Sequence, residues 1–384
     1  MNVRLRAAWL LAVLVCAGLH PKPTSAQAYR FTDIGTLNGG YTVAYSINDN
    51  GQIAGSSNHS SGYLRAIRVD STTVNGQQTW FVDNGAGGNA QTTLLGLPSK
   101  TYNWSIGRAI NAFGQVTGTC QGTASSLPES ATIWSQTGAA KVLTSSKVKS
   151  EGFGISNTGA VSGVIYGSTN SGTVWRLVSG TYTATTIQPI SPYNGAIGFG
   201  LNNLDQSSGA LYTAGSAGDS FLWLPYMFYT LPAGTNRLPT GFKAIGNEGA
   251  PNINDQGIIS GVNGNLAALW LPAGAGAAYG LVDGVNNIHD ATSIFVTSTA
   301  IGVNTPGSAQ PLLVVGSGKD SLGNTYGWVW DSTSKKMRNL SDPAVTPNLP
   351  SGWIVKLARG VNTHGQIVGT GTYNGVTRGF VLAP

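Results

Sequence analysis

Charged residues are scarce in this sequence. They make up 9% of the 384 residues, and the formal net charge is +6. Subtracting Arg4, Arg6 and Lys22, which lie in the N-terminal segment described below, from the 21 basic residues leaves 18 against 15 acidic ones. A net charge of about +3, scattered along the chain, argues against a nucleic acid or an anionic membrane surface as the partner.

Cysteine and long apolar runs are also scarce. The chain has two cysteines, Cys16 and Cys120, and Cys16 lies in the N-terminal segment. A single remaining thiol excludes an intramolecular disulfide, so burial of apolar side chains must stabilise the fold. After residue 28 no apolar stretch approaches the ~20 residues of a membrane-spanning helix, which predicts no membrane span in the mature chain.

The N-terminal segment has the pattern of a secretory signal peptide. Two arginines precede an apolar run at residues 7–19, and the small residues of T-S-A-Q-A suit cleavage after Ala26 or Ala28. The sequence therefore predicts a signal peptide at residues 1–28. The mature chain, residues 29–384, would be secreted or held in the cell envelope, either extracellular or periplasmic.

One skeleton returns throughout the mature chain. The stretch Ala44 to Gly55 reads A-Y-S-I-N-D-N-G-Q-I-A-G, with a branched aliphatic residue before an Asn anchor and a glycine three residues after it. Ser156 replaces the Asn in the third copy, and Asp205 replaces the glycine in the fourth. Copies spaced 45 to 63 residues apart indicate a tandem repeat, and the seven anchors are Asn48, Asn111, Ser156, Asn202, Asn254, Asn304 and Asn362.

Each copy has the pattern of about four β-strands. Asn at the first and Gly at the fourth position of a four-residue turn are typical of a tight reversal between two strands. A third apolar run then ends in a bulky residue such as Trp134 or Trp330, and a weaker fourth run ends for example at Leu143 or Leu340. A period near 50 residues with four strands per unit predicts the blades of a β-propeller.

Small residues recur at two positions of the repeat. Blades packed around an axis are most crowded at their innermost strand, so small residues at one position place the first strand innermost; a composition with 54 glycines is the alternative explanation. Four residues before the anchor stand Ala44, Gly107, Gly152, Gly198, Ala250, Ala300 and Ala358. A second glycine closes the run after the turn, at Gly55, Gly118, Gly163, Gly215, Gly261, Gly316 and Gly369.

The two ends of the mature chain are complementary. Residues Tyr29 to Leu37 resemble a fourth strand, while the last copy stops at Pro384 after its third strand. The N-terminal strand would complete the last blade and remove both free sheet edges. We therefore expect an all-β fold, one seven-bladed β-propeller closed by the N-terminal strand, which occupies residues 29–384 as a single domain.

The variable loops suggest where a ligand would bind. The links that enter each inner strand vary, as do those between second and third strands, whereas the turn inside each first hairpin is tight in most copies. Variable loops on one face of a rigid scaffold are the usual place for binding. We expect polar and aromatic residues of that face to form the ligand site, unless they are ordinary solvated loop residues: Trp104, Arg108, Glu151, Glu248, His289, Trp353, Lys356 and Arg359.

No motif in the chain predicts a catalytic residue, a metal site or a cofactor. Gly218-Asp219-Ser220-Phe221 resembles the start of a hydrolase motif, but it occupies the slot before a third strand, which favours a structural role. Gly316 to Lys319 resembles part of a phosphate loop without its first glycine. The mature histidines lack metal-ligand spacing, and the N-D-N-G turn at Asn48 has too few carboxylates for calcium.

The first and last copies resemble the repeat of the HAF-type extracellular repeat proteins of bacteria. The resemblance rests on Asp33 to Gly55, D-I-G-T-L-N-G-G-Y-T-V-A-Y-S-I-N-D-N-G-Q-I-A-G, and on Arg359 to Gly371, R-G-V-N-T-H-G-Q-I-V-G-T-G. The His-Ala-Phe triad of that repeat is absent; Arg65-Ala66-Ile67 stands in its place in the first copy. The resemblance implies export and a β-propeller-like repeat, and it supplies no catalytic residue.

These observations leave two main hypotheses for function. The first is a monomeric, secreted, non-enzymatic propeller that binds a carbohydrate, a surface polymer or a protein on its loop-rich face. The alternative is an extracellular polysaccharide-active hydrolase or lyase with Glu151, Glu248 or Arg108 at the mouth of the central channel, because a propeller brings distant residues together. A purely structural role in a matrix or envelope is a third possibility.

Overall fold

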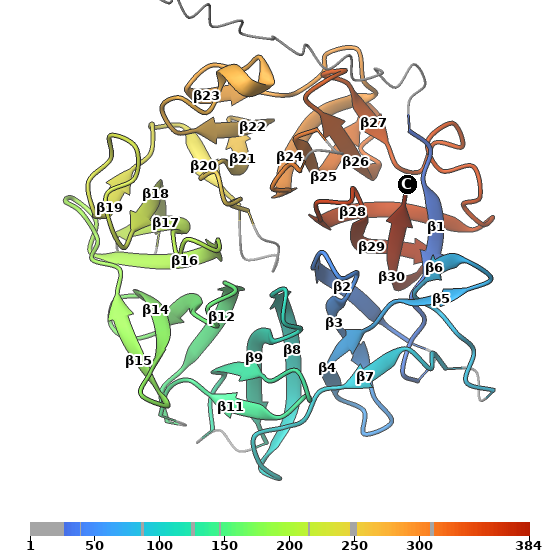
Figure 1. The fold of residues 1–384 in the computed structure, drawn as a ribbon, viewed down its shortest axis with the longest axis horizontal. Helices are drawn as coiled ribbons and strands as arrows, with labels where there is room; N and C mark the ends of the chain where they lie inside the picture. The colour runs from blue at the N-terminus through green and yellow to red at the C-terminus, as the bar shows by residue number, and fades with distance from the viewer. Residues whose placement is uncertain are drawn as a thin grey trace, which may run out of the picture.

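Seven four-stranded antiparallel sheets surround a central axis in the computed structural model (Figure 1). The structure describes residues 27–38, 40–85, 88–123, 127–145, 147–213, 216–245, 252–307 and 311–384. Within these ranges the helical content is one 3-10 turn, η1 (Ala277–Tyr279), and no helix has the length and apolarity to cross a membrane. The prediction of a seven-bladed β-propeller is confirmed.

The first four blades follow one another from the N-terminus. Blade 1 holds β2 (Thr42–Ile47), β3 (Ile53–Asn58), β4 (Leu64–Val69) and β7 (Thr92–Leu94), and a small hairpin, β5 (Thr72–Val74) and β6 (Gln77–Thr79), is inserted before β7. Blade 2 holds β8 (Tyr102–Ile110), β9 (Val116–Gly122), β10 (Ser130–Trp134) and β11 (Ala140–Val142). Blade 3 holds β12 (Ser150–Ile155), β13 (Val161–Ile165), β14 (Ser171–Val178) and β15 (Thr181–Thr186). Blade 4 holds β16 (Gly195–Leu201), β17 (Ser207–Thr213), β18 (Ser216–Leu224) and β19 (Gly234–Arg237).

The last three blades complete the ring. Blade 5 holds β20 (Phe242–Ala244), β21 (Ile259–Asn263), β22 (Leu266–Leu271) and β23 (Gly284–Asn287). Blade 6 holds β24 (Phe295–Val303), β25 (Leu313–Asp320), β26 (Thr325–Asp331) and β27 (Met337–Asn339). Blade 7 holds β28 (Trp353–Val361), β29 (Ile367–Tyr373), β30 (Val376–Ala383) and β1 (Arg30–Asp33).

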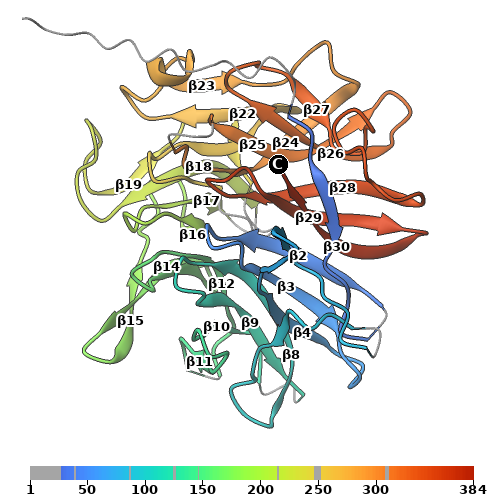
Figure 2. The same cartoon turned by 45° about the vertical axis from the view of Figure 1, so that its right-hand side comes forward.

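The N-terminal strand closes the ring as predicted. β1 pairs antiparallel with β30, so that Phe31 lies opposite Leu382 (Figures 1 and 2). The ring of Phe31 also packs edge-on against Trp353 at the start of β28, with 4.7 Å between ring centroids. Segments from the two ends of the chain therefore form one sheet with a shared apolar core.

The apolar core lies between the blades. Seven clusters of buried side chains each combine residues of two neighbouring blades; in one of them Trp134 of blade 2 joins Ala54 and Ala66 of blade 1. Cys120 belongs to the same cluster, and burial raises the pKa of its thiol to about 12. Cys120 is thus a core residue and a poor nucleophile at neutral pH.

The small residues predicted for the hub do lie at close contacts between blades. A Cβ atom at Gly107 would lie 3.1 Å from the carbonyl oxygen of Gly55 in blade 1, and Ala44, Ala300 and Ala358 are fully buried. Ala250 lies outside the described residues. Six inner strands also have a β-bulge next to this position, and the extra bulge residues are Tyr45, Arg108, Phe153, Phe199, Ile301 and Arg359.

The second glycine of the repeat is required by a close backbone approach. A Cβ atom there would lie 1.9 to 2.3 Å from a carbonyl oxygen of the inner strand, a distance that no side chain tolerates. In blade 4 this residue is Gly209, opposite Gly198, and not Gly215 as predicted, because Gly209 follows its anchor Asn202 at the same spacing as Gly55 follows Asn48. The glycines at this position are Gly55, Gly118, Gly163, Gly209, Gly261, Gly316 and Gly369.

Candidate functional site

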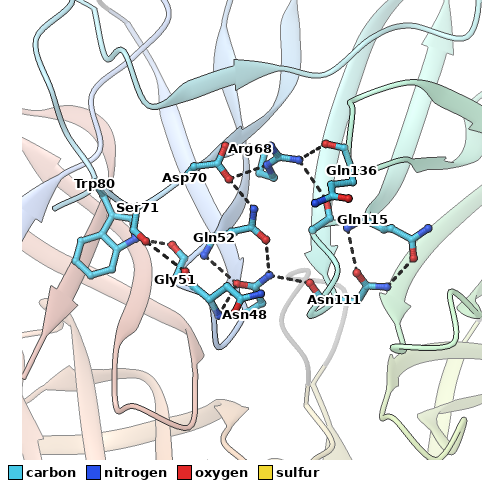
Figure 3. Close-up of polar contacts among 12 residues, drawn as sticks. Asn48, Gly51, Gln52, Arg68, Asp70, Ser71, Trp80, Asn111, Gln115 and Gln136 are labelled. Carbon is cyan, nitrogen blue, oxygen red and sulfur yellow. Dashed lines mark hydrogen bonds and ion pairs between the residues drawn. The ribbon is translucent and has the colours of Figure 1, made fainter. Parts of the chain in front are cut away.

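The Asn anchor of the repeat holds its own turn and also contacts the next blade. Oδ1 of Asn48 accepts hydrogen bonds from the backbone amides of Asn50 and Gln52, at 3.1 and 2.9 Å. Nδ2 donates to Oε1 of Gln52 and, across the blade boundary, to the carbonyl oxygen of Asn111 at 2.8 Å (Figure 3). Both the oxygen and the nitrogen of the buried Asn48 amide are therefore hydrogen-bonded.

The same bond joins neighbouring turns around the axis. The anchor amide donates to the carbonyl oxygen of the next anchor at distances of 2.8 to 3.0 Å. The last of these bonds links blade 7 back to blade 1, so the chain of turns is circular. The five donors are Asn48, Asn111, Asn202, Asn254 and Asn362. We call the face that carries these turns the turn face, and the opposite face the entry face.

Two junctions use other bonds. Oγ of Ser156 donates to Oδ1 of Asp205 in blade 4 at 2.7 Å, and the same carboxylate pairs with Nε of Arg176 at 3.1 Å. Asp205 has a φ of 56° because it occupies the turn position that is glycine elsewhere. Between blades 6 and 7, Nδ2 of Asn304 donates instead to the carbonyl oxygen of Pro311 in its own blade.

A polar rim lies just outside the ring of anchors. It consists of the residues that follow the anchors: Asp49, Ala112, Asn157, Asn203, Asp255, Thr305 and Thr363. The backbone amide of one rim residue donates to the side chain of the next; for example Asn203 donates to Asp255 at 2.8 Å, and Thr363 donates to Asp49 at 2.9 Å. These bonds orient the rim side chains before any ligand arrives.

The rim and anchors enclose a cavity of about 430 Å³ at the mouth of the channel. Inside the rim, an aliphatic ring supplies the apolar part of the lining: Ile47, Ile110, Ile155, Leu201, Ile253, Val303 and Val361. Asp49 and Asp255 are charged, and the cavity lining in the described chain contains no basic side chain to neutralise them. The mouth is therefore acidic, with polar walls and an apolar inner surface.

The bulge residues form a second ring, two residues before the aliphatic ring on each of these inner strands. The guanidinium of Arg108 lies 4.9 Å from the ring centroid of Phe153, and that of Arg359 lies 4.9 Å from the centroid of Tyr45. Phe153 also packs edge-on against Phe199. A bulge turns an extra side chain out of the sheet, which explains how neighbouring inner strands bring these buried groups together.

Of the residues predicted to bind a ligand, the structure brings Arg108 and Glu151 together. Their side chains form an ion pair at 2.8 Å, and each is largely buried. Tyr166 donates a hydrogen bond to the other oxygen of Glu151 at 2.8 Å. Burial first, and then the charge of Glu151, raise the pKa of the Tyr166 hydroxyl well above its usual range.

The other predicted residues are dispersed. Trp353 is a core residue, stacked on Tyr373 and packed against Phe31. Lys356 lies over the ring of Tyr326, and Nδ1 of His289 shares a hydrogen bond with Ser298. Trp104 is half-buried in β8, Arg359 belongs to the bulge ring, and Glu248 lies outside the described residues. The lining of the mouth cavity includes none of these side chains.

Asp219 and Ser220 have structural contacts. Asp219 is buried and pairs with Nε of Arg237 at 2.6 Å, and it accepts a hydrogen bond from the hydroxyl of Tyr193. Oγ of Ser220 accepts the backbone amide of Ala244 in the next blade at 2.7 Å. Neither side chain is arranged as part of a nucleophile and base pair.

Comparison with known proteins shows the fold alone. No protein-family model matches the chain, and no curated protein matches it; the resemblance to HAF-type repeats therefore stays a prediction. A structure from a study of two prolyl endopeptidases is 11% identical, with a TM-score of 0.51 over 92% of this chain and 51% of that one. The propeller domain of the trilobed protease of Pyrococcus furiosus is 9% identical, with a TM-score of 0.49 over 89% and 95%. The lectin BP39L of Burkholderia pseudomallei is 12% identical, with a TM-score of 0.38 over 90% and 98%.

Proposed function

We propose that this chain is an exported, non-enzymatic binding protein that takes an uncharged or amine-bearing sugar of a polysaccharide into the cavity of the turn face. The observation that carries the proposal is that cavity, about 430 Å³ in volume and built by the turns of all seven repeats. Its volume lies within the range of small-molecule sites, which are about 300–1,000 Å³. The predicted signal peptide and the resemblance to extracellular repeat proteins agree with a ligand outside the cytoplasm.

The chemistry of the lining favours binding over catalysis. Its described side chains are Ile, Leu, Val, Ala, Asn, Asp and Thr, without Ser, Cys, His, Lys or Tyr, so the carboxylates of Asp49 and Asp255 are the groups of this lining able to act as acid or base, and each already accepts the backbone amide of a neighbouring rim residue. The amides are already occupied in holding the turns, as Asn202 does with Asn254 and Gln206. A cavity wall whose side chains are already fixed is suited to recognition, because little conformational entropy is lost when a ligand binds.

The pattern of charge favours a particular sugar class. Asp49 accepts one bond at Oδ1, from the amide of Thr363, and the described part of the chain gives its Oδ2 no partner. Such an oxygen accepts a hydroxyl or an ammonium group, and the aliphatic ring offers contact to the apolar face of a sugar. Two carboxylates without a neutralising cation repel a uronate.

Binding to an oligosaccharide panel tests the proposal. The panel contains neutral gluco-oligosaccharides, partially N-acetylated chitosan oligosaccharides and oligogalacturonates, and titration calorimetry follows the positive members. We expect the chitosan and neutral members to bind and the oligogalacturonates not to bind. Release of new reducing ends from any bound member would overturn the non-enzymatic part of the proposal.

A cavity-filling variant assigns the binding to the mouth. Thr363→Trp places an indole at the rim where the described contacts of the chain give the threonine hydroxyl no hydrogen bond to lose. We expect it to abolish binding while leaving the unfolding transition in place. The control is Thr181→Trp, on the exposed outer strand β15, which should bind like the unaltered protein. Equal binding by both variants would contradict a site at the mouth.

A further inference from the structure

The rim of the cavity is interrupted at one position. Six of the seven rim residues present a carboxylate, an amide or a hydroxyl, whereas Ala112 presents a methyl group. Ala112 also lines a second hollow, of about 370 Å³, between blades 1 and 2 on the same face. The two hollows therefore share the rim residue that has the smallest side chain.

The second hollow, which we call the side groove, is built from both blades. Its lining residues are Asn50, Gln52, Asp70, Ser71, Ala112, Phe113 and Gln136. The side chain of Phe113 is 61% exposed, in the turn that follows the Asn111 anchor. The groove thus combines one exposed aromatic ring with amide side chains, and aromatic and polar groups of this kind line small-molecule sites.

The walls of the side groove are fixed by an ion pair within blade 1 and a hydrogen bond across the blade boundary (Figure 3). Arg68 binds both oxygens of Asp70 at 3.0 Å, and its Nη1 donates to the carbonyl oxygen of Gln136 in blade 2 at 2.6 Å. Gln52 donates to the same carboxylate at 2.7 Å. The charge of Asp70 is thereby neutralised, so the groove is uncharged while the central cavity stays acidic.

The inserted hairpin of blade 1 supports this wall from outside. Nε1 of the buried Trp80 donates to the carbonyl oxygen of Gly51, and Ser71 donates to that of Asn50 at 3.2 Å. The longest departure from the repeat, residues 70–90, thus lies on the turn face. The insertion therefore supports the residues that line the side groove, beyond what the four strands of the blade provide.

We propose that the side groove is a second sugar subsite, reached from the central cavity through the gap at Ala112, with the sugar ring stacked on Phe113. This inference rests on the proposed function, because it takes the central cavity as the first subsite. An extended glycan would place one unit in the acidic cavity and the adjacent, uncharged unit in the side groove. The protein would then recognise a chain of sugars better than a single one.

Two variants test the side groove with one matched control. The probes are a partially N-acetylated chitosan pentasaccharide and the monomers glucosamine and N-acetylglucosamine. Phe113→Ala removes the stacking surface, and we expect about tenfold weaker binding of the pentasaccharide with unchanged binding of the monomers. Leu204→Ala changes the equivalent turn position of blade 4, which is 36% exposed, and should leave both affinities unchanged.

The second variant closes the gap. Ala112→Asn gives blade 2 the rim residue found in blades 3 and 4. It also offers the amide of Asp49 the acceptor that rim amides find at other junctions, for instance Ala112 with Asn157 at 2.9 Å. We expect the pentasaccharide to bind Ala112→Asn no more tightly than a monomer does. Unchanged unfolding would show that the loss does not come from the fold.

The outcomes separate the two proposals. If the unaltered protein binds neither the pentasaccharide nor the monomers, the proposed function fails and the side groove fails with it. If Thr363→Trp abolishes binding while Phe113→Ala and Ala112→Asn leave the pentasaccharide affinity unchanged, the central site stands and the side groove is wrong. A pentasaccharide that binds no better than the monomers would also overturn the second subsite, and would favour a protein as the occupant of the groove.

Discussion

The junction between blades 1 and 2 and the junction between blades 3 and 4 make the same connection with different residues. At the first, the amide of Asn48 reaches the carbonyl oxygen of Asn111, and glycine completes the turn. At the second, Ser156 is too short to span the gap, and Asp205 extends from the next blade to meet it. Ser156, which replaces the anchor Asn, and Asp205, which replaces the turn glycine, are thus the two partners of one contact.

The comparison shows what each solution requires. The Asn solution needs only groups of the repeat itself, and it leaves glycine, which adopts a positive φ without steric cost, at the turn position. The Ser and Asp solution holds Asp205 at a φ of 56°, a conformation that costs about 1 kcal/mol or more for a residue with a Cβ. It gains three partners for the carboxylate in return: Ser156, Thr158 and Arg176.

The largest effect should come from breaking an Asn junction. Asn111→Ala removes the bonds that Oδ1 accepts from two backbone amides of its turn, and the bonds that Nδ2 donates to Oε1 of Gln115 and to the carbonyl oxygen of Ser156, at a buried residue. With about 1 kcal/mol per bond and a further cost for buried groups left unpaired, we expect a loss of about 3 kcal/mol. Urea unfolding measures it, with Asn111→Asp as the companion that keeps the acceptor and removes the donor. A loss below 1 kcal/mol in both variants would refute a ring held by its amides.

Breaking the alternative junction should cost less. Asp205→Ala removes the carboxylate from Ser156, Thr158 and Arg176 but keeps a Cβ at positive φ, and we expect about 2 kcal/mol. Asp205→Gly loses the same contacts and relieves the backbone, so about 1 kcal/mol should remain. The difference between the two variants measures the strain of the turn. Equal stabilities would mean that the turn carries no strain.

Removing the shorter partner should have a smaller effect. Ser156→Ala loses the hydroxyl bonds to Asp205 and to the hydroxyl of Thr158, while Asp205 keeps Thr158 at 3.0 Å and Arg176. We expect about 1 kcal/mol by thermal or urea unfolding. A destabilisation as large as that of Asp205→Ala would show that the hydroxyl, and not the ion pair, makes the junction.

Restoring the repeat should have the smallest effect of all. Ser156→Asn combined with Asp205→Gly rebuilds the Asn junction, so the double variant should be within about 0.5 kcal/mol of the unaltered protein. Its stability should exceed the value obtained by adding the effects of the two single variants. Simple additivity in this double-mutant cycle would show that the two exceptions are independent, contrary to the contact between them.

The fold could be predicted from the sequence because short sequence patterns that determine turns and strands recur in every repeat. The turns at Asn48 and its equivalents, the small residue on each inner strand and the closing strand near Tyr29 all follow from spacing and residue size. The bulges were not predicted, since nothing in the pattern distinguishes Tyr45 from a regular strand residue. The misassigned glycine of blade 4 has another origin, because Gly209 follows Asn202 at the regular spacing of the repeat and the prediction assumed an insertion before the glycine.

The candidate site was harder to predict, because the residues that build it also build the turns. Turn chemistry explains Asn48 and Asn254 locally, and a turn accepts Asp or Ser as well as Asn. The signal that could have revealed the ring is that nearly every anchor is Asn, the one of these residues whose side chain accepts at one atom and donates from another, so that it can hold its own turn and reach the next blade at once. The variability of the loops favoured the entry face as the binding site. The role of Asp49, Asp255 and Ala112 in a shared cavity depends on how the seven turns come together in space, which no single copy of the repeat indicates.

The pairing of β1 with β30 sets the order of events when the chain folds. Arg30 and Ala383 are partners in one sheet, although almost the whole chain separates them. Contacts between residues so distant in sequence carry a high entropic cost and slow folding. Blades 1 to 6 each pair strands that are near one another in the sequence. Blade 7 pairs strands from both ends of the chain, so it can be completed only after the C-terminal strands have been made. Assembly of the ring should therefore end in one slow, late step.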